Sequence, residues 1–248
     1  MLEHLSVSQL TTYLGCPRRY AYRYVEKAPP ERRSSALAFG IALHETLRWL
    51  LEHRMSGDTP GWDAARLAFR QAWDDAVAPG GFEESAEELA ELGRRGEQLV
   101  HAYLEHDQVL VPDDVEARVV VDLVDPRTGR PLDVPLLGYV DALAGSTVVE
   151  FKTAARKASP WKWRLQLAAY SIAFRKQRGS RPTMRVVQLV KTKEPQVVVD
   201  DVRLTDADEA WFVELAAEVL TGIRSGVFFP NPGWMCRSCE FRDRCGVP

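Results

Sequence analysis

Two carboxylates and a lysine lie close together in a short segment, residues 138–152, whose sequence predicts a β-hairpin. Gly145-Ser146 separates two mostly apolar runs and is a signal for a two-residue turn. Counting outward from that turn places Asp141 opposite Glu150, and Lys152 follows on the same face. Hard divalent cations bind such paired carboxylates, and the ammonium can face a phosphate or a water beside the metal. The alternative is a solvated sheet face that carries these charges without a ligand.

Three more polar side chains are candidates for the same site. His44 lies in an expected helix, where an ordinary surface or core histidine is the alternative to a metal ligand. Gln166 and Tyr170 are four residues apart and therefore share one face of another expected helix. For this pair the alternative is a tyrosine packed in the core beside a glutamine with a local hydrogen bond.

Four cysteines are distributed asymmetrically along the chain: Cys16 near the start, and Cys236, Cys239 and Cys245 near the end. In a cytosolic chain this number favours metal or cluster ligation over disulfides. Four thiolates suit a [4Fe–4S] cluster or a tetrahedral Zn²⁺. Either centre would tie the two ends of the chain together.

Hydrophobic periodicity and turn signals predict the elements that position these residues. The expected helices cover 6–26 (beginning at Ser6 or Ser8), 36–55, 62–77, 83–108, a segment that starts at Ser159-Pro160, and 206–225. The expected strands cover 116–124, 134–144, 147–152, 185–191 and 196–203. A strand meander followed by a strand–helix–strand crossover predicts an α/β (α+β) fold with a small mixed sheet flanked by helices.

Charge is divided unevenly along the chain, although its formal net value is only −3. Residues 151–193 contain twelve Lys or Arg and no Asp or Glu, whereas residues 83–97 contain six Glu and two Arg. The basic block adjoins the expected metal site, so we expect a phosphate-binding groove there, with solvated surface faces as the alternative. No apolar run is long enough to span a membrane and no signal pattern is present, so we expect a cytoplasmic location.

Taken in order, these motifs resemble the PD-(D/E)XK nuclease superfamily. The matching segments are Gly40-Ile-Ala-Leu-His44, Gly138-Tyr-Val-Asp141, Glu150-Phe-Lys152, Gln166-Leu-Ala-Ala-Tyr170 and the cysteine set. Their arrangement is similar to the RecB-like iron–sulfur exonuclease branch, which includes CRISPR-associated exonucleases and AddB-type nucleases. The resemblance runs from about Leu5 to Cys245 and implies a restriction-endonuclease-like fold with an N-terminal helical region and a C-terminal cysteine-ligated cluster.

The resemblance also implies a role for each candidate residue. It assigns Mn²⁺ or Mg²⁺ binding to His44, Asp141, Glu150 and the main-chain carbonyl of Phe151. It assigns catalysis to Lys152, Gln166 and Tyr170 together with the two carboxylates. It makes Cys16, Cys236, Cys239 and Cys245 the ligands of a [4Fe–4S] cluster, with Zn²⁺ as the alternative.

The implied activity is a divalent-metal-dependent DNA exonuclease that acts on single strands or ends, in recombination and repair or in CRISPR adaptation. A helicase, a recombinase or a CRISPR integrase is the expected kind of protein partner, and no membrane is expected. The alternative is a non-catalytic DNA-binding scaffold on a nuclease fold. We expect one domain over 1–248, with a helical insertion at 56–115 and a cluster region formed by Cys16 and residues 230–248.

Overall fold

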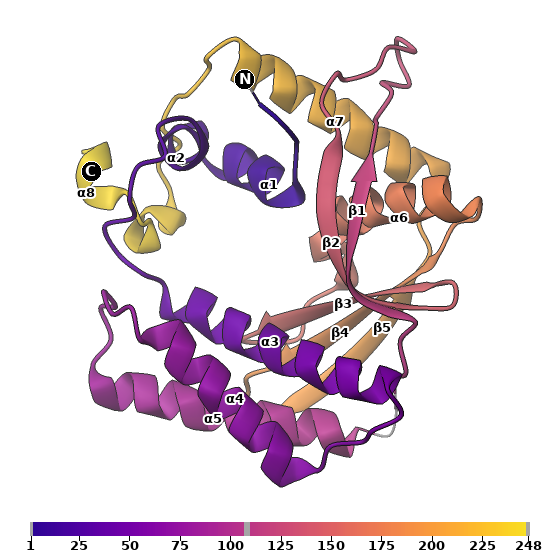
Figure 1. Cartoon of the computed structure of the whole chain (residues 1–248). Helices are drawn as coiled ribbons and strands as arrows, with labels where there is room; N and C mark the ends of the chain where they lie inside the picture. Colours follow the sequence, from indigo (N-terminus) through magenta and orange to yellow (C-terminus); the bar gives the residue numbers. More distant parts are fainter. Residues whose placement is uncertain (1, 107–109, 247–248) are drawn as a thin grey trace.

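A five-stranded mixed sheet forms the centre of the computed structural model, which describes residues 2–106 and 110–246 (Figure 1). The strands follow one another in space in chain order, and only β3 and β4 are parallel. Parallel neighbours need a crossover connection, which the helix between them provides. The strands are β1 (Asp114–Val121), β2 (Leu136–Ala144), β3 (Thr147–Ala154), β4 (Thr183–Val190) and β5 (Gln196–Val202).

Helices cover both faces of the sheet, as Figure 1 shows. On one face α3 (Ser35–Met55), α4 (Trp62–Val77) and α5 (Ala86–Glu105) enclose a core that contains Phe39, Phe69 and Phe151. On the other face α1 (Val7–Gly15), α6 (Arg164–Arg178) and α7 (Asp206–Arg224) enclose a core that contains Leu167 and Phe212. The predicted α/β class, a mixed sheet flanked by helices, is confirmed.

The predicted hairpin forms with the expected register. Ala144 pairs with Thr147, and the ladder continues to Ala142 and Val149. Val148 packs in one core and Val149 in the other, so alternate residues of β3 serve both helical layers. The next positions beyond this ladder are Asp141 on β2 and Glu150 on β3.

The N-terminal helical region differs from the single helix predicted for residues 6–26. The chain is helical in α1, extended at Cys16, and helical again in α2 (Pro17–Tyr20) and a π-helix (Ala21–Val25). The single-helix prediction is wrong because Pro17 disfavours the helical conformation at the residue before it and cannot donate to a preceding carbonyl. Cys16 thus caps both helices: its N–H donates to the Thr12 carbonyl, and its own carbonyl accepts from the Tyr20 N–H.

The helix predicted at 62–77 is confirmed as α4, and the other boundaries agree to within a few residues. The helix predicted at 83–108 begins after a capping box formed by Ser85 and Glu88 and ends at Glu105; positions 107–108 lie outside the described residues. Within the predicted insertion 56–115 lie α4, α5 and the first residues of β1. The segment from Ser159-Pro160 begins as a 3₁₀ helix (Pro160–Trp163) before α6. No helix in the described part of the chain is both long and apolar enough to cross a membrane.

The two ends of the chain meet. The C-terminal segment contains a 3₁₀ helix (Trp234–Ser238) and α8 (Arg242–Cys245), and it lies beside α2 (Figure 1). Main-chain bonds join them, because the N–H of Arg18 donates to the Phe229 carbonyl and the N–H of Glu31 donates to the Glu240 carbonyl.

Candidate functional site

The hairpin carboxylates meet a helix at the point where the β2–β3 ladder ends. The Phe151 N–H donates to Oδ2 of Asp141 at 2.7 Å, which fixes the orientation of this carboxylate. Nδ1 of His44, on α3, lies 3.4 Å from Oδ1 of the same group. Burial lowers the pKa of His44, but its hydrogen bond to Asp141 and the nearby negative charges of Asp141 and Glu150 outweigh burial, so its net pKa is raised. The predicted His44, Asp141 and Glu150 are therefore brought together.

Glu150 is the most enclosed member of the site, with a side chain 2% exposed. Its Oε1 accepts hydrogen bonds from Lys152 Nζ at 2.6 Å and from Gln166 Nε2 at 2.7 Å. Its Oε2 is buried and has no hydrogen-bond partner. Burial, followed by the negative charge of Asp141, raises the pKa of Glu150 to about 7 against the opposing effect of Lys152. A buried oxygen without a donor costs free energy, and a bound cation would remove that cost.

The helix after β3 supplies the other two predicted residues. Gln166 Oε1 accepts from Lys152 Nζ at 2.8 Å, and Gln166 Nε2 lies 3.2 Å from the Tyr170 hydroxyl. That hydroxyl donates to the Tyr139 carbonyl at 2.7 Å. Burial and the charge of Glu150 raise the pKa of Tyr170, which keeps its proton in place as a donor. A chain of side-chain bonds thus runs from the buried carboxylate through α6 to the main chain of β2.

Glycine makes this contact between α6 and β2 close. A Cβ at Gly138 would lie 2.8 Å from Cε1 of Tyr170, nearer than side-chain carbons normally approach. The glycine that opens the Gly138-Tyr-Val-Asp141 motif therefore makes room for the tyrosine of the Gln166–Tyr170 motif.

Glu116 on β1 is a residue of this region that the sequence analysis did not identify. The β1–β2 register pairs Val115 with Ala142 and Ala117 with Val140, which leaves Glu116 level with Asp141. Its φ of 52° is left-handed, an uncommon conformation for a residue other than glycine. Burial and the charge of Asp141 raise its pKa. The residue is exposed, as the alternating strand sequence predicts, so its place level with Asp141 follows only from the β1–β2 register.

The chemistry of these donors fits a hard divalent cation. Carboxylate oxygens of Asp141 and Glu150 with one imidazole nitrogen of His44 suit Mn²⁺ or Mg²⁺. The Oε2 atom of Glu150 has no hydrogen-bond partner and is therefore available as a metal ligand. Within residues 2–106 and 110–246, no three such side chains are already arranged around a single metal position. Lys152 serves instead as the counter-ion of Glu150.

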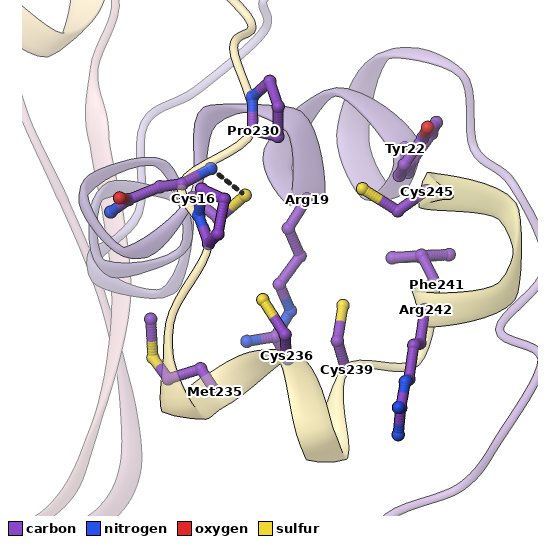
Figure 2. A pocket seen from close by; sticks show the side chains of 12 residues that line it. Cys16, Arg19, Tyr22, Pro230, Met235, Cys236, Cys239, Phe241, Arg242 and Cys245 are labelled. Carbon is purple, nitrogen blue, oxygen red and sulfur yellow. Dashed lines mark hydrogen bonds between the residues drawn. The ribbon is translucent and has the colours of Figure 1, made fainter. Parts of the chain in front are cut away.

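The four predicted cysteines line one pocket between the ends of the chain (Figure 2). Their sulfur atoms face a shared space, with the Arg19 side chain among them. The Asn231 N–H lies 3.4 Å from Cys16 Sγ, and the Gly233 N–H lies 3.4 Å from Cys236 Sγ. None of the four forms a disulfide. As at the first site, the described side chains have no ready metal-holding arrangement here.

Comparison with known proteins places this geometry in a family. A search of curated proteins found no match. A solved structure from Eubacterium rectale, described as that of a "putative exonuclease", is similar with a TM-score of 0.61 at 14% sequence identity, over 99% of this chain and 89% of that chain. Likeness at this identity concerns the fold. The family model of the PD-(D/E)XK nuclease superfamily matches residues 4–246. This match spans both the hairpin site and the cysteine pocket, and the chain therefore belongs to the PD-(D/E)XK nuclease superfamily.

Proposed function

We propose that this protein is a divalent-metal-dependent DNA nuclease that removes nucleotides from single strands or ends. The observation that carries the proposal is the buried, unpartnered Oε2 of Glu150 next to Asp141 and His44, in a chain of the nuclease superfamily. His44, Asp141, Glu150 and the Phe151 carbonyl would hold Mn²⁺ or Mg²⁺. Bound there, the cation would supply Lewis-acid polarisation of a phosphodiester and acidification of a water.

The residues around the carboxylates would orient the reacting groups. Lys152 lies 20% exposed between Glu150 and the surface, so its ammonium can reach a phosphate oxygen or the attacking water while Gln166 keeps it in place. Gln166 bonds both Lys152 and Glu150, which holds the lysine and the carboxylate in fixed relation. Tyr170 in turn ties Gln166 to β2. Preorganised charges of this kind lower the barrier for a reaction that develops negative charge on phosphate.

The test is cleavage of end-labelled single-stranded, duplex and covalently circular DNA with Mn²⁺, Mg²⁺ or EDTA. We expect metal-dependent loss of linear strands, with circles spared, and no cleavage by Lys152→Ala or Glu150→Gln. Arg66→Ala, which removes a positive charge from α4, is the control and should cleave normally. Cleavage of circles would make the enzyme an endonuclease. DNA binding without cleavage in any metal would instead support a non-catalytic scaffold.

We also propose that the cysteine pocket holds a [4Fe–4S] cluster that joins the two ends of the chain. Support comes from four thiols facing one space and from main-chain N–H groups directed at two of the sulfur atoms, an arrangement that stabilises cluster sulfur. Anaerobically purified protein should be brown and contain about four irons per chain. A colourless protein that contains one zinc per chain would show instead that the pocket holds Zn²⁺.

We further propose that the nuclease acts in recombination and repair or in CRISPR adaptation, with a helicase, a recombinase or an integrase as its protein partner.

A further inference from the structure

The uncovered side of α3 carries His44 together with exposed apolar side chains. Leu37 is 57% exposed and Ile41 is 48% exposed, whereas the residues on the opposite side of the helix are buried in the core. Positions 37, 41 and 44 are four and three residues apart, so they form one stripe along the helix. The side of α3 that delivers the imidazole to the site is therefore apolar over the two turns that precede it.

The strand that supplies Asp141 has the same feature. Tyr139 lies two residues earlier on β2, and this residue is 50% exposed. Its main chain is held by the Tyr170 hydroxyl, so the ring projects from a fixed point. Its cross-strand partner is the exposed Arg118, and direct partners in a ladder point to the same face. An exposed aromatic ring and an exposed cation thus lie next to each other, two residues before Asp141 along β2.

Exposed apolar groups therefore lie on both elements that carry site residues, before His44 on α3 and before Asp141 on β2. A phosphodiester backbone needs only the charges, so the apolar stripe and the ring require a second kind of ligand surface. The faces of nucleobases provide it, but only when the bases are unstacked, because a duplex keeps its base faces inside the helix. A tyrosine beside an arginine is a combination that stacks a base and pairs with the adjoining phosphate.

We propose that Leu37, Ile41 and Tyr139 bind unstacked bases of a single DNA strand on either side of the phosphodiester held at Asp141 and Glu150, and that Arg118 contacts its backbone. The inference rests on the proposed function and deepens it, because it makes single strands, including frayed ends, the substrate class. The ladder of β1 and β2 and the helix α3 position these contacts before any DNA binds. A duplex could enter only after its end has opened.

The test measures binding rather than cleavage, by fluorescence anisotropy in EDTA with a fluorescein-labelled oligo-dT and a blunt duplex of equal length. Tyr139→Ala should weaken oligo-dT binding at least about fivefold, since stacking of one base on an aromatic side chain is worth at least that factor. The double variant Leu37→Ser/Ile41→Ser should weaken it about as much, because it removes the apolar contact of two side chains with the bases. Duplex binding should stay within about twofold, because phosphate contacts remain. Tyr139→Phe should bind oligo-dT like the original protein.

Leu67→Ser is the matched control, because Leu67 on α4 is 69% exposed and lies outside the stripe. Thermal melts of all variants check folding. Unchanged oligo-dT affinity in Tyr139→Ala and in the double variant would overturn the inference, because these side chains would then not bind DNA. An equal loss for oligo-dT and duplex would also overturn it, because the contacts would then not depend on unstacked bases. In either case metal-dependent cleavage would still support the proposed function. Tyr139-dependent binding of oligo-dT without any cleavage would instead support the inference and overturn the proposed activity.

Discussion

Replacing Glu150 with glutamine should stabilise the metal-free protein at alkaline pH, although it removes an active-site group. The carboxyl is buried next to Asp141, and its pKa is raised from 4.5 to about 7. A raised pKa means that the folded state binds the proton more tightly than the unfolded state does. Stability is therefore present below pH 4.5 and is lost as the pH rises towards 7.

The magnitude follows from the two pKa values. With a pKa of about 7, ionising Glu150 in the folded state costs on the order of 1 kcal/mol at pH 5 and on the order of 3 kcal/mol at pH 8.5, a difference of roughly 2 kcal/mol. Glutamine has no such cost, and in the variant Lys152 keeps its hydrogen bond to Gln166. The change in the free energy of unfolding caused by Glu150→Gln should shift by that difference in favour of the variant between the two pH values. Effects of the amide that do not depend on pH cancel in this comparison.

The assay is urea unfolding in EDTA at pH 5 and pH 8.5, followed by circular dichroism. Glu209→Gln is the control, because this equally buried glutamate is paired with Arg175 and Arg181 and its loss should destabilise the protein at pH 8.5. Saturating Mn²⁺ should stabilise the original protein and not Glu150→Gln, since the cation replaces the missing partner of Oε2. A Glu150→Gln effect that is the same at both pH values would refute the reasoning.

Three further substitutions test the packing that positions the site. Gly96→Ala should destabilise the protein by about 2 kcal/mol or more in urea unfolding, because the new Cβ would lie 1.9 Å from Cζ of Phe69 and force α4 and α5 apart. Gly138→Ala should cost about 1–3 kcal/mol and also lower nuclease activity, because the Tyr170 ring must move; an active, fully stable variant would contradict the close contact. Tyr170→Phe should cost about 1 kcal/mol and reduce the maximal rate rather than DNA affinity, because the hydroxyl's bonds to the Tyr139 carbonyl and to Gln166, which positions Lys152, are lost; steady-state kinetics on labelled oligonucleotides separates the two.

Local signals explain what the sequence could predict. The turn at Gly145-Ser146 and the alternation around it determine the hairpin register, and this register brings Asp141 close to Glu150. The break at Cys16 could also be predicted, because Pro17 follows it directly, but the helical pattern on both sides favours a single continuous helix. The place of Glu116 level with Asp141 could not be predicted, because it depends on the β1–β2 register and on a left-handed φ, neither of which a local sequence pattern encodes.

The site depends on three segments that are remote in sequence and that only the folded chain brings together. The carboxylate pair is a property of the hairpin alone, but His44 comes from α3 and Gln166 from α6, which cover opposite faces of the sheet. Both helices reach these carboxylates because the β2–β3 ladder ends at Ala142 and Val149. Beyond that pair, the carboxylates are open to the helices on both faces of the sheet. At the end of the ladder, the Phe151 N–H, His44 from α3 and Gln166 from α6 therefore all reach the two carboxylates. Extending the β2–β3 pairing by two steps, to Val140 and Phe151, would give the Phe151 N–H a main-chain partner and release Asp141 from the bond that now orients it.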